Sequence, residues 1–291
     1  MTMELTDVNE IRALLARHGF RFSKSLGQNF LVADWVPRDI AAAAGLDENV
    51  GVLEIGPGVG CLTRELSERA GKVVAVELDG ALRPVLAETL AGLANVELVY
   101  GDVLRQDLAA LTAEHISPLR PAVCANLPYN VTTPVLTKLI ESGLFGTITV
   151  MLQREVARRI CAAPDTPDYG AFSVFVQWHM TAELLFDVPP ACFIPQPKVT
   201  SSVIRLTRRA APPYAVRDEK LFMRIVRAAF SQRRKTLVNA LGAGLGLDKG
   251  LAASALTECG LDVRVRGEAL SIAEFASLCE KIGDLCDVPS Q

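Results

Sequence analysis

The chain has 291 residues, half of them hydrophobic and 22% charged, and its formal net charge is −3. This length suggests one large domain or two domains, and this composition can build a hydrophobic core. The slightly negative net charge excludes a global positive field that would attract nucleic acid. Any such binding must therefore come from local basic patches.

Cysteine and histidine usage indicates neither a disulfide framework nor a zinc site. The seven cysteines form an odd set without a C-x-x-C pair, and the three histidines are widely scattered. We expect buried free thiols in a reducing compartment, no metal and no histidine-based triad. The amino terminus is polar, and no apolar stretch of about 18 residues occurs, which disfavours a signal peptide and a membrane span. We therefore expect a cytoplasmic protein.

The first predicted element is a helix that begins at a cap-like sequence, 7–10, and places Ile11, Leu14 and Leu15 on one face. The segment 21–31 that follows is basic, contains glycine and is rich in amides. Its composition favours a solvated surface loop, and the alternative is a lid that covers a ligand. Residues 36–44 then predict a short helix.

An apolar run, 52–55, ends in three glycines at alternate positions, Gly56, Gly58 and Gly60, and an amphipathic run follows them. This pattern predicts a buried strand, a tight turn and a helix start, whose N–H groups are free to bind a polar or anionic group. The third glycine comes one position earlier than in the dinucleotide fingerprint, which favours another nucleoside-like ligand. Taken alone, the turn is also compatible with no ligand.

The next two predicted strands, 72–77 and 96–102, each end in an acid, Glu77 and Asp102. Ligands of doubly wound sheets sit beyond the carboxyl ends of the strands, where Glu77 could accept hydrogen bonds from both hydroxyls of a ribose. Asp102 could accept one from the amino group of an adenine. The alternative for both acids is the capping of a following helix. Strands that alternate with helices predict a mostly parallel sheet.

The fourth predicted strand ends in Ala125-Asn126-Leu127-Pro128-Tyr129-Asn130, which reads either as an ordinary turn or as a site for an aryl amine. The lone pair of such an amine is delocalised into the ring, so it is a poor nucleophile. The Asn126 side-chain oxygen and the Leu127 or Pro128 carbonyl could accept its two hydrogens, and Tyr129 could stack on the base. This arrangement needs positioning and electrostatics but no strong base.

Together, these motifs resemble those of class I S-adenosylmethionine-dependent methyltransferases that act on an amino nitrogen of adenine. The stretch 25–31 narrows the resemblance to the ribosomal RNA adenine N6,N6-dimethyltransferases. The stretches 153–157, 193–201 and 229–237 narrow it further to the small-subunit enzymes, from about residue 20 to near the end. The resemblance implies an α/β fold, with a Rossmann-like methyltransferase domain over residues 1–207 and a small helical RNA-binding domain over 208–291. It also implies that 180–188 and 201–207 form a terminal antiparallel hairpin, while the residues of 146–153 themselves predict a fifth strand.

The resemblance also implies site residues, including a lid in the segment where composition favoured a loop. S-adenosylmethionine would be bound by Gln28, Asn29, Leu31, Gly56, Glu77, Leu78, Asp102, Val103 and Asn126. The target amine and base would be held by Asn126, Leu127, Pro128 and Tyr129, with Phe193 completing a sandwich around the base. One departure is the acidic stretch 164–168, where relatives commonly have a Pro-Gly turn and a lysine, so we expect no RNA phosphate contact there.

After a linker at 207–213 the sequence pattern predicts helices, and positive charge is concentrated at the start of this region. Residues 208–235 hold nine basic and two acidic residues, a local net charge of +7. A solvated helix face is one explanation for such a run. We instead expect duplex RNA to be held here by shape and backbone contacts, through Arg224, Arg227, Arg233, Arg234 and Lys235. A capping box at 271–274 begins the last predicted helix, which carries no chemistry.

The expected reaction is transfer of two methyls from S-adenosylmethionine to N6 of each of two adjacent adenosines near the 3′ end of 16S rRNA, in the small subunit. The expected partner is that rRNA in a 30S-like particle, with the enzyme acting as a monomer. Two alternatives remain open. One is a large-subunit rRNA adenine dimethyltransferase of the resistance type, and the other is a non-catalytic RNA-binding assembly factor.

Overall fold

The computed structural model describes residues 3–23 and 27–287, and the chain forms two compact units. The first comprises residues 1–157 and 182–208, and the second comprises 158–181 and 209–291. These units differ from the predicted division at residue 207 in the segment 158–181, which groups with the carboxyl-terminal helices.

The first unit is built on a seven-stranded sheet with the strand order β4-β3-β2-β5-β6-β9-β7. Strands β2 to β6 are parallel, and β9 runs antiparallel to β6. The parallel strands are β2 (Val50–Ile55), β3 (Lys72–Glu77), β4 (Val96–Tyr100), β5 (Arg120–Asn126) and β6 (Thr147–Gln153). The remaining two are β9 (Ser201–Arg208) and β7 (Met180–Val188), side by side at one edge as predicted.

Position in the sheet explains the strand sequences. All six residues of β2 are buried, because this central strand is covered on both faces, whereas the five residues of β4 at the edge are only partly buried. Continuous apolar runs such as β2 and β3 are typical of buried parallel strands. The predicted strand at 96–102 begins at the correct residue, but strand pairing ends at Tyr100. Asp102 therefore lies in the loop beyond the strand.

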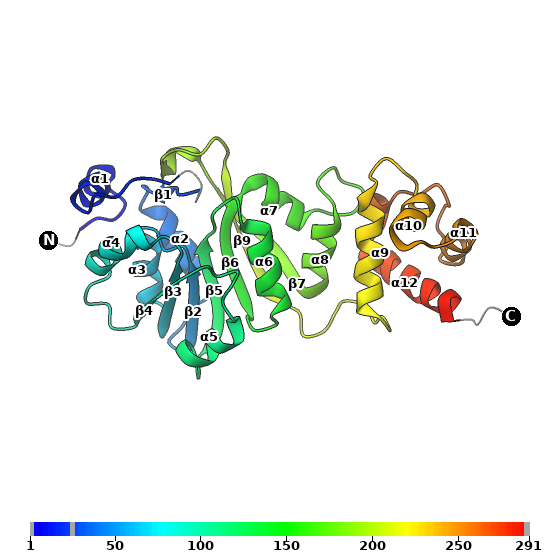
Figure 1. Ribbon diagram of the computed structural model, residues 1–291, viewed down its shortest axis with the longest axis horizontal. Helices are drawn as coiled ribbons and strands as arrows, with labels where there is room; N and C mark the ends of the chain where they lie inside the picture. The colour runs from blue at the N-terminus through cyan, green and yellow to red at the C-terminus, as the bar shows by residue number, and fades with distance from the viewer. Residues whose placement is uncertain (1–2, 24–26, 288–291) are drawn as a thin grey trace. The chain divides into compact units, whose positions relative to one another are not determined.

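Helices follow the strands and flank the sheet (Figure 1). The amino-terminal α1 (Val8–Arg17) is capped by the Asp7 side chain, which accepts hydrogen bonds from two backbone N–H groups as predicted. The predicted helix at 36–44 is α2 (Trp35–Ala43). The connections are α3 (Cys61–Ser67), η2 (Gly80–Leu82), α4 (Arg83–Thr89), α5 (Leu108–His115), α6 (Thr132–Glu141) and α7 (Arg154–Cys161).

A second, two-stranded sheet ties the segment 27–31 to the first unit. Strand β1 (Phe30–Leu31) pairs antiparallel with β8 (Phe193–Ile194), which follows η3 (Pro190–Cys192). Phe30 and Leu31 are buried in the main core. The part of the predicted lid at 24–26 lies outside the described residues, but the part that follows is therefore a packed element and not a solvated loop.

The second unit is helical and has its own core. Its helices are α8 (Ala171–His179), α9 (Glu219–Ser231), α10 (Leu237–Leu245), α11 (Lys249–Glu258), η4 (Gly267–Ala269) and α12 (Ile272–Asp287). Trp178 of α8 stacks on Phe222 of α9 at 4.0 Å between ring centroids, and both are fully buried. The predicted capping box of α12 is confirmed, because Ser271 and Glu274 exchange hydrogen bonds at 2.7 and 3.2 Å.

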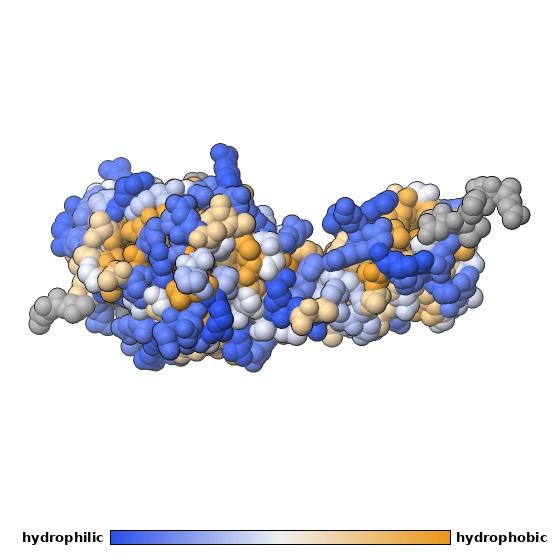
Figure 2. Space-filling view, turned by 90° about the horizontal axis from the view of Figure 1, so that it is seen from below, coloured by the Kyte–Doolittle hydropathy of each residue, from blue (hydrophilic) through white to orange (hydrophobic). Residues whose placement is uncertain are grey.

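The surface of the face shown in Figure 2 is largely hydrophilic, with smaller apolar areas between. Six cysteines within the described range are free thiols, four of them buried. Among the described residues, no helix is both long and apolar enough to cross a membrane, and no group of three or more metal-ligating side chains is found.

Candidate functional site

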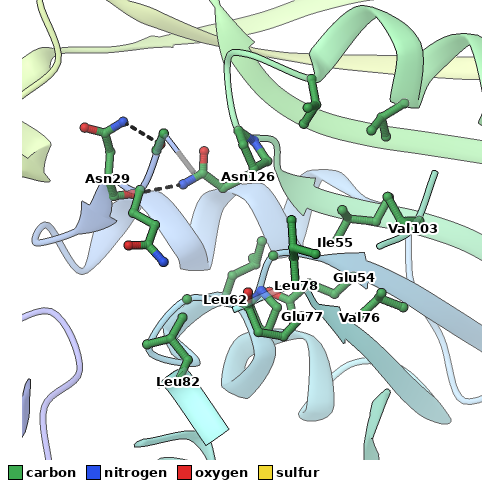
Figure 3. A pocket seen from close by; sticks show the side chains of 18 of the residues that line it. Asn29, Glu54, Ile55, Leu62, Val76, Glu77, Leu78, Leu82, Val103 and Asn126 are labelled. Carbon is green, nitrogen blue, oxygen red and sulfur yellow. Dashed lines mark hydrogen bonds between the residues drawn. The ribbon is translucent and has the colours of Figure 1, made fainter. Parts of the chain in front are cut away.

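A pocket lies in the first unit at the carboxyl ends of the parallel strands (Figure 3). Four segments supply most of its walls: the segment 27–31, the glycine turn after β2, the ends of β3 and β4 with the loops after them, and the turn after β5. The parallel register brings these ends together, since Ile55 pairs with Val76 and Glu77 pairs with Tyr100. The predicted convergence of the motifs at one sheet edge is thus confirmed.

The glycine turn needs glycine for its backbone and for its contacts. Gly56, Gly58 and Gly60 all have positive φ, at 70°, 62° and 91°, which L side chains rarely adopt. A Cβ at Gly58 would also lie 3.1 Å from the Phe30 ring. The turn is therefore the surface against which β1 packs, and the glycines let that segment come close.

The two predicted acids both line the pocket and are held by backbone N–H groups. Glu77 Oε1 accepts from Asp79 N at 2.7 Å, and Asp102 Oδ1 accepts from Leu104 N at 2.9 Å. Burial raises the pKa of Glu77, and the hydrogen bond from the Asp79 N–H offsets only part of this increase. Each carboxylate has a second oxygen besides the bonded one, so both acids can accept from a ligand while staying fixed.

A third acid, Glu54, lies at the floor of the pocket and is 1% exposed. Its Oε2 is buried and has no hydrogen-bond partner among the described residues. Burial, together with the charge of Glu77, raises the pKa of Glu54 to about 8. The ionised form of this buried carboxyl would be stabilised by a donor or a cation, which a ligand could supply.

The segment 27–31 closes one side of the pocket through side-chain amides. Gln28 accepts from Ser23 N at 2.9 Å and donates to Asp79 at 2.7 Å, so it joins this segment to the loop after β3. Asn29 donates to the Gly27 carbonyl at 3.0 Å. Gln28, Asn29 and Leu31, predicted to contact the cofactor, all line the pocket.

The turn after β5 forms the facing side. Asn126 Nδ2 points to the Asn29 carbonyl at 3.5 Å, a long and weak contact that leaves the amide oxygen for other partners (Figure 3). The Tyr129 hydroxyl bonds to Ser201 Oγ at 2.6 Å, which fixes the ring. Burial raises the pKa of Tyr129, so the phenol stays protonated at neutral pH.

Two predicted residues do not line the pocket. Leu127 is buried, and its N–H donates to the Met151 carbonyl. Phe193 is 2% exposed and pairs with Leu31 in the small sheet. Phe193 is therefore a core residue in this structure, and its part in a base sandwich stays a prediction.

Sequence reasoning also missed two polar residues that hold the walls. Asp79 links Gln28 to the loop after β3, and Lys138 of α6 holds the loop after β4 through two backbone carbonyls. Asp79 could have been noticed two positions after Glu77. Lys138 gives no sequence signal, because its partners are backbone atoms more than thirty positions away.

The lining fits S-adenosylmethionine, which carries a sulfonium and an adenine. Three acids line the pocket, and its lining within the described range includes no lysine, arginine or histidine. Carboxylates at this position would attract a sulfonium or an ammonium. Apolar side chains from several strands and loops suit the faces of a purine (Figure 3): Ile55, Leu62, Val76, Leu78, Leu82 and Val103.

The predicted RNA-binding cations all belong to the second unit but differ in their environment. Arg224, Arg227, Arg234 and Lys235 are exposed and have no ion-pair partner among the described residues. Arg233 instead bonds to Glu268 at 2.9 Å and to the Pro167 carbonyl at 2.5 Å. Arg233 therefore links the acidic stretch 164–168 to Glu268. A backbone hydrogen bond from Asp165 N to the Glu268 carbonyl links the same two parts of the chain.

Comparison with known proteins agrees with this geometry. A family model described as "Ribosomal RNA adenine dimethylase" matches residues 19–283. A protein named "Ribosomal RNA small subunit methyltransferase A" from Geobacillus thermodenitrificans is 48% identical over 96% of this chain and 97% of its own length. A protein of the same name from Streptococcus pneumoniae is 46% identical over 96% of this chain and 98% of its own length.

Two solved structures share the fold. The 23S rRNA methyltransferase ErmE is 28% identical with a TM-score of 0.68, covering 87% of this chain and 99% of its own. A dimethyladenosine transferase from Plasmodium falciparum is 24% identical with a TM-score of 0.72, covering 85% of this chain and 95% of its own. The cofactor is S-adenosylmethionine, and the chain belongs to the ribosomal RNA adenine dimethylase family.

Proposed function

We propose that this protein transfers methyl groups from S-adenosylmethionine to N6 of two adjacent adenosines near the 3′ end of 16S rRNA, in the small ribosomal subunit. Each adenosine would receive two methyls, during ribosome biogenesis. The observation that carries the proposal is that Asn126, Pro128 and Tyr129 share one pocket with Glu77 and Asp102. A site for an aryl amine thus adjoins a site for the methyl donor.

The chain's own residues would prepare the amine. S-adenosylmethionine supplies an electrophilic methyl on a sulfonium. The Asn126 amide nitrogen is directed to the Asn29 carbonyl, so its oxygen would accept one N6 hydrogen. The Leu127 carbonyl would accept the other, because the Pro128 carbonyl already accepts from Val131 N and Thr132 Oγ1. Accepting these hydrogens would free the nitrogen lone pair to attack the methyl group that the bound cofactor would supply, with the neutral thioether as leaving group, and N6 would then lose a proton to solvent.

The target adenine would have to leave its stack to reach this turn. Tyr129, fixed by Ser201, would provide a stacking face for the base. The RNA itself would be held by the exposed cations of the second unit, Arg224, Arg227, Arg234 and Lys235. We expect a monomer that acts in the cytoplasm without a metal.

The substitution Asn126→Ala tests the assignment of the amine site. Methyl transfer should fall by orders of magnitude while cofactor affinity falls much less, because the missing amide acts on the incoming amine. Turnover on undermethylated 30S particles and calorimetry with S-adenosylmethionine measure the two effects. Asn49→Ala, an exposed asparagine before β2, is the matched control. Equal losses of turnover and affinity would contradict the assigned role.

A second candidate function is dimethylation of large-subunit rRNA, favoured by the likeness to ErmE. The higher identity of the small-subunit relatives over nearly the whole chain favours the small subunit. Radiolabelled methyl offered with both subunits, each undermethylated, separates the two. Label in 23S rRNA alone would select the second candidate, and no label in either would favour a non-catalytic assembly factor.

A further inference from the structure

The loop between β4 and α5 forms one wall of the cofactor pocket, through Gly101, Asp102, Val103 and Leu104. The orientation of Asp102 depends on this loop, since its Oδ1 accepts from Leu104 N at 2.9 Å. Its carbonyl accepts from Arg105 N at 2.9 Å and from Gln106 N at 3.2 Å. A change in the loop would therefore turn the carboxylate.

Lys138 ties this loop to α6. Its Nζ donates to the Leu104 carbonyl at 2.8 Å and to the Gln106 carbonyl at 2.6 Å. Both bonds are charge-assisted and therefore stronger than neutral ones. Within the described part of the chain Lys138 has no acidic partner, so its charge serves these two carbonyls.

The helix that carries Lys138 also belongs to the pocket. Helix α6 begins directly after the turn that holds Asn126 and Tyr129, and Val135 of the same helix lines the pocket. Lys138 itself does not line it. Any effect of Lys138 on a ligand must therefore pass through the loop that it holds.

We propose that Lys138 is a positioning residue that sets the pocket's selectivity for the adenine of the cofactor. By holding Leu104, it fixes the residue whose N–H orients Asp102, and it keeps Val103 against the base. This inference rests on the proposed role of Asp102 as the acceptor for the adenine amino group. It assigns to α6 a role in cofactor recognition in addition to its place after the target-amine turn.

Calorimetry with two probes tests the proposal without RNA. The probes are S-adenosylhomocysteine and S-inosylhomocysteine, in which an oxo group replaces the amino group of the base. Lys138→Met keeps the apolar stem but removes the donors. It should weaken S-adenosylhomocysteine binding about tenfold and S-inosylhomocysteine binding much less, because the amino group no longer meets a fixed acceptor. Lys138→Arg should restore most of the preference.

Lys72→Met is the matched control, because Lys72 is also half-buried and also makes a 2.8 Å contact, to Glu97, but lies at the amino end of β3. It should leave both affinities unchanged. An unchanged adenine preference in Lys138→Met would overturn the proposal, whether or not the melting temperature falls. The proposal would also be overturned if the wild-type protein bound both probes with equal affinity.

Asp102→Asn tests the assignment on which the inference rests, and it should also reduce the adenine preference. If Asp102→Asn leaves the preference intact, Asp102 is not the acceptor for the adenine amino group, and the inference about Lys138 fails as well. Failure of the proposed rRNA methylation would show separately, as absence of label in RNA while the two probes still bind with different affinities.

Discussion

At the scale of single residues, the pocket buries an acid with one carboxyl oxygen that is unpaired within the described part of the chain. Glu54 is 1% exposed, and Oε2 has no hydrogen-bond partner among the described residues. Cys61 and Cys124 lie near it, and burial raises the pKa of Cys61 to about 12, so these thiols stay protonated. When it is ionised, this buried carboxyl destabilises the fold unless a positively charged ligand lies beside it. Cofactor binding and protonation of this site should therefore be linked.

The pH dependence of stability tests this linkage. Burial raises the pKa of Glu54 from its ordinary value of 4.5 to about 8, so between these values the folded protein binds a proton that the unfolded chain has released. Stability should then fall as pH rises through this window, by at most about 1.4 kcal/mol per pH unit. Glu54→Gln removes the titration. The melting temperature of the variant minus that of the wild type should therefore increase as pH rises.

Melting curves of the two proteins at several pH values, without cofactor, measure the difference. Saturating S-adenosylmethionine should flatten the wild-type dependence, because its positive charge favours ionised Glu54. Parallel melting temperatures for wild type and variant across the whole window would show that Glu54 does not titrate there.

At the scale of elements, the stretch after α9 contains neighbouring arginines with different surroundings. Arg233 bonds to Glu268 and to the Pro167 carbonyl, whereas Arg234 is exposed and has no such partner in the described ranges. Arg233→Gln should lower the melting temperature by a few degrees, since half-exposed interactions of this kind contribute about 0.5–1 kcal/mol. Arg234→Gln should leave it unchanged but should reduce the salt dependence of RNA binding.

Each variant is the control for the other, because both remove one positive charge from adjacent positions. Thermal melting and RNA binding at several salt concentrations measure the two effects. If Arg233→Gln changes the salt dependence as much as Arg234→Gln does, Arg233 also binds phosphate, and its bonds within the unit are exchanged for RNA.

The strands, the glycine turn and the acids at the strand ends could be predicted because each depends on local pattern and on the rule that parallel strands end together. The packing of segment 27–31 could not be predicted from its polar composition, which resembles a solvated loop, because it depends on the pairing of Phe30 and Leu31 with β8. Phe193 could not be placed for the same reason. Only the family resemblance placed Gln28, Asn29 and Leu31 at the cofactor. Lys138 and Arg233 act on backbone carbonyls distant in the chain, and such partners leave no trace in sequence spacing.

At the scale of the whole molecule, the residues for chemistry and the exposed cations belong to different units. The proposed methylation site is in the first unit, and the exposed basic residues of 208–235 are in the second. The net charge of −3 opposes RNA as a whole. Affinity should therefore depend on where positive charge lies and much less on how much of it the protein carries.

A pair of fourfold variants with equal charge tests this. Arg224, Arg227, Arg234 and Lys235 are changed to Gln in one, and Arg12, Arg17, Arg38 and Arg120 of the first unit are changed to Gln in the other. Each takes the formal net charge from −3 to −7, since four positive charges are removed. Only the first should bind undermethylated 30S particles much more weakly, and its plot of log affinity against log salt should flatten by about 0.7–0.9 for each phosphate that the protein no longer neutralises. Equal weakening of both variants would mean that net charge governs binding and that the second unit holds no RNA site.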